Sequence, residues 1–353
     1  MKRAGVAAQI VALALAACAS PVAVPRRDIP PPEPIAKPAA LPAAEQRPVP
    51  NAPADAERAL GVSDRGVYSD LDDKLQLPAP RAEQSLAGLV DARRGLFVVY
   101  ADGWPYKIYP LGGGAELRLG GERLSLRPGD RAELASLSFP VRRLGANEVA
   151  PPGDHDDDGI PDPLDLLIGA EKTVLDAAEY DDAYFSLRYP AGDPPRNRGA
   201  CVDVVVRAVR NAGVDLQQAI IEDERKNAGA YGVKSPDVSI DHRRVRNDIV
   251  YFKRHWVAHG IDLTDSADRW LPGDVVFLDT FASRPGPDHV GIVTPERGPS
   301  GHPLIVNLWT FGYRTGKMDL LGAVPITHRF RFPSRMSRGP AVARPAKNGY
   351  SGP

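Results

Sequence analysis

Short apolar runs separated by turn residues occupy the stretch between residues 96 and 126. Residues 96–100 are apolar, residues 106–109 alternate, and two further runs flank Gly120 and Gly121. Such runs are typical of strands, and paired glycines between two of them favour a hairpin. The pattern predicts a small β-rich module over residues 58–150 with a binding or packing role, and one helix near residues 82–93.

A different pattern follows in the second half of the chain. Apolar residues recur at helical spacing over residues 166–179 and again over residues 201–213, where Gly213 is expected to end the helix. Apolar runs that resemble strands come later, at residues 275–278, 289–293 and 303–309. Helices followed by strands predict an α+β domain over residues 166–333.

The first residues have the organisation of a bacterial export signal. A charged start precedes an apolar run at residues 6–15, which is too short to span a bilayer. Residues 15–18 resemble a lipobox, which implies a lipoprotein signal peptide over residues 1–17 and a lipid anchor on Cys18. The alternative is an ordinary signal peptide cleaved nearby. No aspartate follows Cys18 directly, which favours a lipoprotein of the bacterial cell envelope, held in the outer membrane and facing the periplasm.

Composition separates the tails from the folded part. Prolines, 36 in total, cluster within residues 18–57, so this segment is expected to be an extended tether, and residues 334–353 a disordered tail. Lys and Arg (44) nearly balance Asp and Glu (45), so no overall charge attracts nucleic acid. No glycine-rich phosphate loop is present, and we expect no organic cofactor.

The acidic stretch at residues 151–165 has the spacing of a calcium-binding loop. Carboxylates occupy loop positions 1, 3, 5, 9 and 12, and Gly159 occupies position 6. Ca²⁺ takes about six to eight oxygen ligands, and the glycine permits the sharp turn that brings them together. The stretch resembles the calcium loops of EF-hand, dockerin and thrombospondin type 3 repeats; the alternative is a solvated acidic linker. The predicted ligands of a structural Ca²⁺ are Asp154, Asp156, Asp158, Asp162 and Asp165.

Cys201 opens the second predicted helix and is the candidate nucleophile. It closely follows Gly199 at a loop-to-helix junction, where unpaired N–H groups and the helix dipole favour an anion. Such a position lowers the pKa of a thiol below its usual value of about 8.5, and the thiolate is the reactive form. A lone cysteine is commonly a small buried hydrophobic residue instead. Because Cys18 is expected to carry lipid, Cys201 would be the one remaining thiol in an oxidising compartment, which favours a function.

His289 begins a predicted strand and is the candidate base. The following strand carries Asn307, which adjacent antiparallel pairing would place beside the imidazole, fixing its tautomer. Gly291 is expected to leave room where the strand passes the Cys201 helix. His242 lies in a separate polar segment, where it either lines the cleft or caps a turn.

Four segments carry a resemblance to a known family: residues 198–203, 241–245, 272–275 and 289–293. In this order they resemble the family called domain of unknown function 1287, over about residues 165–333. That family is regarded as a distant branch of the NlpC-type, papain-like cysteine hydrolases. The resemblance implies an α+β, papain-like fold in which a helix carrying Cys201 packs on a small antiparallel sheet carrying His289. Asn307 stands where the family often has histidine.

These observations combine into the hypothesis of an envelope cysteine hydrolase. His289 would take the proton of Cys201, and the thiolate would attack a carbonyl whose oxyanion is held by N–H groups at the helix start. Asp203 and His242 would lie near the substrate, which location suggests is a peptide or amide bond of peptidoglycan. Acyl or peptidyl transfer by the same residues is a variant. The alternative is a non-catalytic, calcium-stabilised envelope binding module with a degenerate hydrolase fold.

Overall fold

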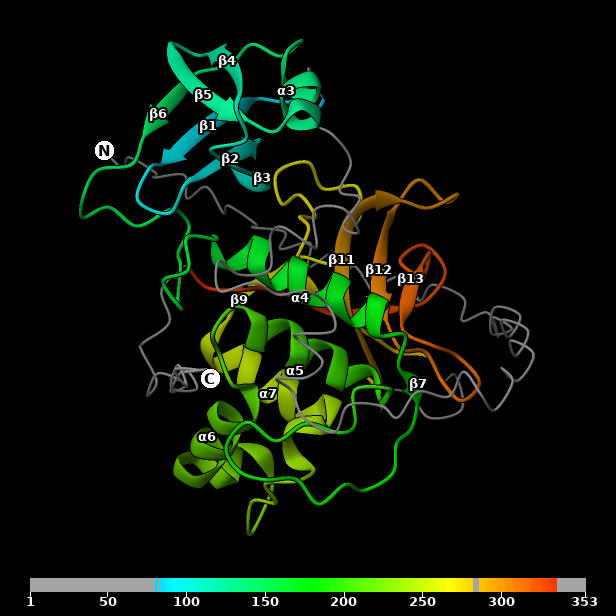
Figure 1. Ribbon diagram of the computed structural model, residues 1–353. Coiled ribbons are helices and arrows are strands. Elements are labelled where there is room, and N and C mark those ends of the chain that lie inside the picture. Colours follow the sequence, from blue (N-terminus) through cyan, green and yellow to red (C-terminus); the bar gives the residue numbers. More distant parts are fainter. Residues whose placement is uncertain (1–79, 82, 282–285, 335–353) are drawn as a thin grey trace, which may run out of the picture.

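The computed structural model describes residues 80–81, 83–281 and 286–334 of the 353-residue chain. The predicted signal peptide, Cys18, the tether and residues 335–353 of the predicted tail lie outside the described residues. Within the described part, no helix combines the length and the hydrophobicity needed to cross a membrane. Figure 1 shows the β-rich module at one end of the molecule and a larger body of helices and strands below it.

The β-rich module is built on a four-stranded sheet in the order β3-β2-β1-β6, in which β1 pairs antiparallel with β2 and parallel with β6. A separate hairpin, β4-β5, turns at the paired glycines as predicted. Its elements are β1 (Leu86–Asp91), β2 (Leu96–Ala101), β3 (Trp104–Pro110), β4 (Ala115–Leu119), β5 (Glu122–Leu126), α3 (Pro128–Leu134) and β6 (Val141–Arg143).

The helix predicted at residues 82–93 is wrong, because the middle of this segment, Leu86–Asp91, forms strand β1. Long-range pairing with β2 and β6 outweighs the local helical spacing. Gly88 indicates the reason: a Cβ atom there would lie 2.7 Å from the Phe97 ring and 2.9 Å from Val141 Cγ2. The glycine therefore lets two neighbouring side chains close over the strand.

The larger part is an α+β domain, as predicted, with a six-stranded sheet in the order β13-β12-β11-β10-β14-β9 whose neighbours are all antiparallel. Its helices are α4 (Asp162–Asp176), α5 (Cys201–Asn211), α6 (Leu216–Tyr231), the 3-10 helix η2 (Asp241–Arg243) and α7 (Val245–His255). Its strands are β7 (Glu179–Tyr180), β8 (Arg198–Gly199), β9 (Val257–His259), β10 (Val275–Leu278), β11 (His289–Arg297), β12 (Pro303–Asn307), β13 (Gly316–Met318) and β14 (Ile326–Arg331).

Helix α5 lies at the centre of the domain core, although it is rich in valine, which favours strands. Val204, Val205 and Val209 are buried and belong to one apolar cluster with Leu166 of α4 and Val290 of β11. Burial on several sides offsets the lower helix propensity of β-branched residues. The central helix thus carries its first residue, Cys201, to the edge of this core.

Both predicted helices before and at Cys201 are present, with shifted ends. Helix α5 ends at Asn211, and Gly213 follows with a φ of 77°, a conformation that suits glycine. Helix α4 starts at Asp162, earlier than predicted, because Pro163 fits the first turn of a helix. Asp162 and Asp165, predicted in the calcium loop, therefore lie in the first turn of α4.

Candidate active site and acidic loop

Cys201 is the first residue of α5, as the sequence predicts. The N–H group of Ala200 donates to Asp203 Oδ2 at 2.6 Å, so the Asp203 carboxylate caps the helix start. The N–H groups of Val202 and Val290 point at the Cys201 sulfur and favour its anion. The thiol therefore lies where the helix start meets strand β11.

The predicted lowering of the Cys201 pKa is wrong. Burial raises the pKa of the thiol to about 12, and the charges of Asp203 and Asp248 add to this rise. Only 6% of Cys201 is exposed, so desolvation of a thiolate outweighs the two N–H groups and the helix dipole. The free protein holds a neutral thiol.

His289 is the first residue of β11 and contacts the next strand through its ring. Its Nε2 lies 3.1 Å from Asn307 Oδ1, and Asn307 Nδ2 donates to the Ile305 carbonyl at 3.3 Å. Because Oδ1 only accepts, Nε2 carries the proton and Nδ1 keeps its lone pair. The Trp309 ring packs edge-on, with centroids 4.8 Å apart. Burial lowers the His289 pKa to about 4, so the ring is a neutral imidazole.

The thiol and the imidazole are neighbours through the backbone of β11. The sulfur faces the N–H of Val290, the residue after His289. No direct hydrogen bond joins the two side chains among the described residues. Gly291 was expected to leave room for α5, but it leaves room for β12 instead. A Cβ atom at Gly291 would lie 2.8 Å from Ile305 Cδ1 and 3.0 Å from the Val306 carbonyl oxygen.

A cleft of about 630 Å³ opens over the thiol. It is bounded by Tyr180, Asp182, Ala200, Cys201, Val202, Arg243, Arg244, Val245, Arg246 and Asp288. Arg246 is exposed and makes no ion pair within the described part of the chain, whereas Arg244 pairs with Asp241 at 3.0 Å. The Oδ2 atom of Asp288, next to His289 in sequence, is buried without a hydrogen-bond partner. Among the described residues that bound the cleft, Arg246 thus presents an unpaired cation to a bound molecule.

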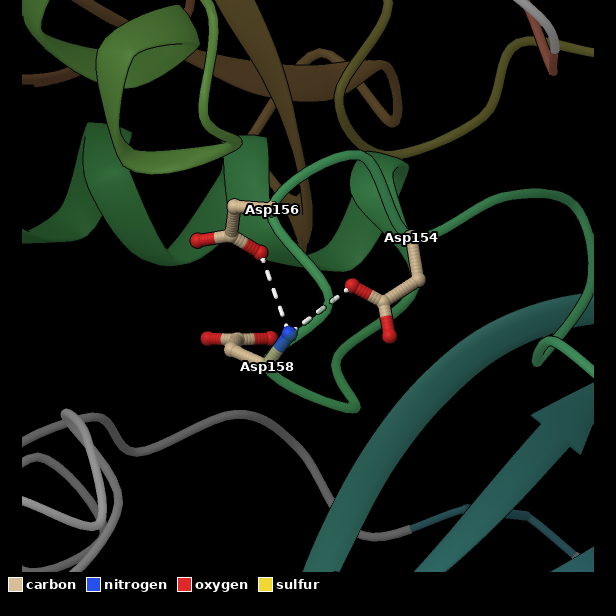
Figure 2. Close-up of side chains that lie close together, drawn as sticks. All are labelled: Asp154, Asp156 and Asp158. Carbon is tan, nitrogen blue, oxygen red and sulfur yellow. Dashed lines mark hydrogen bonds between the residues drawn. The ribbon is translucent and has the colours of Figure 1, made fainter. Parts of the chain in front are cut away.

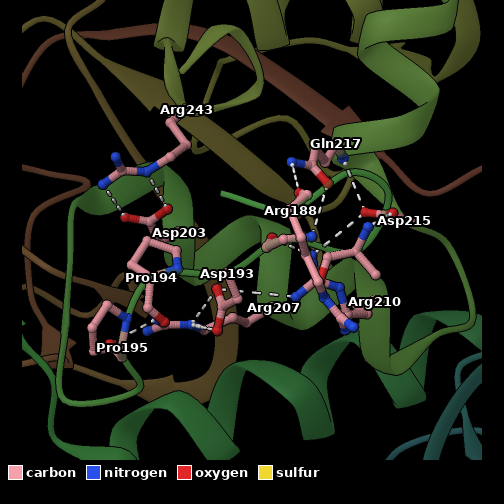
Figure 3. A network of polar contacts seen from close by, with 12 residues as sticks. Arg188, Asp193, Pro194, Pro195, Asp203, Arg207, Arg210, Asp215, Gln217 and Arg243 are labelled. Atoms are coloured by element: carbon pink, nitrogen blue, oxygen red, sulfur yellow. Dashed lines mark hydrogen bonds and ion pairs between the residues drawn. The ribbon is translucent and has the colours of Figure 1, made fainter. Parts of the chain in front are cut away.

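Asp203 does not line this cleft. Its side chain is 1% exposed and forms a two-pronged pair with Arg243, with N–O distances of 2.8 Å and 2.9 Å. Arg243 also donates to the Ala183 carbonyl at 3.1 Å. Figure 3 shows this pair within a wider set of acid–arginine contacts, in which Arg207 donates to the Asp193 carboxylate and to the Pro194 carbonyl. Asp203 thus positions Arg243 at the cleft wall.

His242 neither lines the cleft nor caps the turn. It is fully buried in η2, and both ring nitrogens lack hydrogen-bond partners in the described structure. Burial lowers its pKa to about 4. The turn is capped by Asp241, whose Oδ2 accepts from the Asp237 N–H at 2.6 Å. His242 is a packed core residue in the free protein.

Three residues near the thiol were missed by the sequence reasoning. Arg243 lies inside the segment at residues 241–245 that carries the family resemblance, and this segment was the available signal. Asp288 directly precedes the candidate base. Asp248 of α7 is fully buried with both carboxyl oxygens unpaired, and burial raises its pKa well above the usual value. No local pattern marks Asp248, because its burial depends on the packing of α5, α6 and α7.

Comparison with known proteins places the larger domain in a family. The model of the family described as "Domain of unknown function (DUF1287)" matches residues 167–332. The chain is 38% identical over 148 residues to the uncharacterized protein YijF of Escherichia coli (strain K12), covering 41% of the chain and 70% of YijF. The chain belongs to the DUF1287 family. This confirms the resemblance carried by the four motif segments. No solved structure matches the chain.

The acidic loop lies outside the cleft, where the β-rich module meets the DUF1287 domain. The carboxylates of Asp154, Asp156 and Asp158 gather at one point, with one oxygen of each within 4.8 Å of the others (Figure 2). The N–H of Asp158 donates to Asp154 at 3.0 Å and to Asp156 at 3.3 Å. Gly159 has a φ of 98°, as the loop position predicts. These three predicted ligands are brought together.

The last two predicted ligands lie beside this group. Asp162 Oδ1 accepts from the His155 N–H at 2.6 Å, and Asp165 Oδ1 accepts from Asn211. Burial raises the pKa of Asp162 to about 7, and the nearby charges of Asp154 and Asp156 add to the rise. Such crowding of carboxylates without a cation is unfavourable, so the donor set fits a hard divalent cation.

Proposed function

We propose that the DUF1287 domain of this chain is a papain-like cysteine hydrolase that cleaves an amide or peptide bond. Cys201 would be the nucleophile, His289 the base and Asn307 the residue that orients the base. The observation that carries the proposal is the 3.1 Å contact from His289 Nε2 to Asn307 Oδ1. His289 lies on β11, where the N–H of the next residue, Val290, faces the Cys201 sulfur. A helix with the thiol at its start, packed on an antiparallel sheet with the base, supports the papain-like assignment.

The proposed enzyme starts from a neutral thiol and a neutral imidazole. Two unit charges about 4 Å apart attract by on the order of 4 kcal/mol at an effective dielectric constant of about 20. This energy corresponds to about three pKa units, which is less than the separation between a thiol pKa of about 12 and an imidazole pKa of about 4. An ion pair is therefore not the resting state. The proton would move to His289 as the sulfur attacks.

The reaction would then proceed in two steps. The sulfur attacks the substrate carbonyl while His289 Nδ1 accepts the thiol proton, and the oxyanion is held by N–H groups at the start of α5. The protonated imidazole gives its proton to the leaving amine, which breaks the amide bond. Water, deprotonated by His289, hydrolyses the thioester and restores the thiol. Catalytic hydrogen bonds are commonly long in the absence of substrate, so the missing thiol–imidazole bond agrees with this sequence.

The substrate proposal rests on location and on the charge of the cleft. A lipid on Cys18 and the proline-rich tether would hold the domain near the envelope polymer peptidoglycan, with the chain in the outer membrane facing the periplasm. The unpaired guanidinium of Arg246 at the cleft suits a carboxylate on the substrate. The stem peptides of peptidoglycan contain both amide bonds and free carboxylates.

The direct test is incubation of the purified chain with muropeptides, followed by mass spectrometry. We expect products whose masses report the addition of one water across an amide or peptide bond. Neither Cys201→Ala nor His289→Ala should form them above background. A wild-type chain that leaves every muropeptide intact, or a Cys201→Ala chain as active as wild type, would refute the proposal.

The state of the Cys201 thiol favours a second function, a non-catalytic binding module with a degenerate hydrolase fold. The thiol is buried, its pKa is raised, and it lacks a hydrogen bond to the imidazole. A binding module would retain muropeptides with the same affinity in wild type and in Cys201→Ala, and would release no product from either. Binding and product analysis on the same samples therefore separate the two functions.

A further inference from the structure

We propose that the loop from Asp154 to Asp165 binds Ca²⁺, and that the bound ion ties the β-rich module to the carboxyl end of α5. This role is independent of the proposed hydrolase activity. The cation would then stabilise the contact between the β-rich module and the DUF1287 domain.

The spacing of the first three carboxylates fits a single ion. One oxygen each from Asp154, Asp156 and Asp158 lies within 4.8 Å of the other two (Figure 2). Ca²⁺–oxygen distances are about 2.3–2.6 Å, so two ligands on opposite sides of one ion are about 5 Å apart. The three oxygens therefore already stand within one coordination sphere.

A buried and incompletely paired carboxylate gives an independent indication of a ligand. Asp165 is 1% exposed, and its Oδ2 has no hydrogen-bond partner among the described residues. Among the charged side chains around it, Asp158 and Asp156 interact most strongly with the Asp165 carboxyl group. This carboxyl group therefore faces the cluster of Asp154, Asp156 and Asp158. Burying a carboxylate oxygen without a partner is costly, and a cation at the cluster would remove that cost.

The charge balance also calls for a cation. Arg94 lies 3.8 Å from Asp154 Oδ2, and Lys172 is the positive charge that acts on Asp165. Among the described residues, Arg94 is shared with Asp91 at 2.9 Å, so it is not devoted to the predicted ligands.

The loop contacts both parts of the chain that the ion would join. Arg94, in the turn between β1 and β2, donates to the Asp157 carbonyl at 2.9 Å. On the other side, a Cβ atom at Gly213 would lie 2.6 Å from Asp156 Cβ, so the loop packs against the segment that follows α5. Asn211, the last residue of α5, donates to the Asp165 carbonyl at 2.9 Å. An ordered loop would therefore fix the end of the helix that begins with Cys201.

The experiment is a titration of the purified chain with CaCl₂ by calorimetry, paired with thermal unfolding in EDTA and in calcium. We expect one binding site per chain. At calcium about a hundredfold above Kd, the unfolding midpoint should rise by about 5 °C or more. The Cys201→Ala variant should respond equally, so failure of the hydrolase proposal would leave this result unchanged.

Asp158→Asn is the test variant, and Asp157→Asn is its matched control, because Asp157 is on the same loop with its side chain 81% exposed. Asp158→Asn removes one repelling carboxylate while its amide oxygen still accepts from the Ile160 N–H. In EDTA it should therefore unfold at or above the wild-type midpoint, and it should lose the calcium response. Asp157→Asn should keep that response. Absence of calcium binding by wild type, or an equal response by Asp158→Asn, would overturn the proposal.

Discussion

At the residue scale, the main feature of the site is a thiol that burial keeps neutral. An acid whose pKa is raised is protonated below that pKa, so the thiolate fraction grows as pH rises. We predict that alkylation of Cys201 by iodoacetamide in the native protein accelerates about tenfold per pH unit across neutral pH, without a plateau. The rate near pH 7 should be at least about a hundredfold below that of free cysteine. Alkylation kinetics followed by intact mass check this prediction.

Unfolded protein is the control for that measurement, because its thiol should react like free cysteine. A rate that levels off below about pH 7, and that loses its plateau in His289→Ala, would instead report a thiolate–imidazolium pair in the free protein. That result would show that the attraction between the two groups exceeds their desolvation.

In the proposed hydrolase, Asn307 would be a positioning residue that acts through His289. Loss of its Oδ1 would release the Nε2–H and let the ring change tautomer or rotate. We predict that Asn307→Ala lowers kcat on muropeptides by about a hundredfold with KM nearly unchanged. Asn307→His, which restores an acceptor of the kind often found in the family, should recover most of the rate. Equal losses in both variants would show that Asn307 has only a packing role.

Arg246 is predicted to hold the substrate carboxylate. Replacement by Gln removes the charge, so KM should rise about tenfold for a substrate with a free carboxylate, with little change in kcat. Arg118→Gln in β4 is the control, because that arginine is also exposed but belongs to the other module. Steady-state kinetics on free and amidated muropeptides check the assignment. An unchanged KM would remove Arg246 from the binding site.

At the element scale, the start of α5 is joined to η2 by a buried ion pair. Asp203→Asn would leave the Arg243 guanidinium buried without its partner, so the protein should lose about 3–5 kcal/mol of unfolding free energy. Asp181→Asn is the matched control, because its partner Arg198 is 55% exposed and the pair is screened by water. Urea denaturation of both variants measures the difference, and equal stabilities would contradict the importance given to burial.

The elements that could be predicted are those whose signal is local. The β4-β5 hairpin follows from its paired glycines, and α5 from its apolar spacing and the glycine beyond its end. Strand β1 could not be predicted, because the need for glycine at position 88 arises only from its contact with the Phe97 ring of the neighbouring strand. Local spacing favoured a helix there, and pairing with two distant strands decided otherwise.

The features of the candidate site likewise divide into those with a local signal and those that depend on long-range packing. Cys201, His289 and Asn307 were proposed from local motifs, and the contact between the last two follows from antiparallel pairing of their strands. The direction in which the Cys201 pKa shifts could not be predicted from the sequence, because the shift depends on burial of the thiol by elements far apart in the chain. Asp248 was missed for the same reason.

At the scale of the whole molecule, the two ends of α5 would serve different purposes. Its first residue lies at the cleft, and its last residue, Asn211, contacts the acidic loop beside the β-rich module. Catalysis and cation binding would thus share one buried helix while using separate side chains. A calcium effect on stability without an effect on the chemistry of the thiol is the expected relation between them.

The central claim is that Cys201 forms a covalent bond with the substrate. Acid quenching during muropeptide turnover, followed by intact mass and peptide mapping, tests it most directly. We predict a thioester adduct, equal in mass to the acyl part of the substrate, on the peptide that contains Cys201, and none in Cys201→Ala. Products that accumulate without any adduct in wild type, and at an undiminished rate in Cys201→Ala, would contradict it.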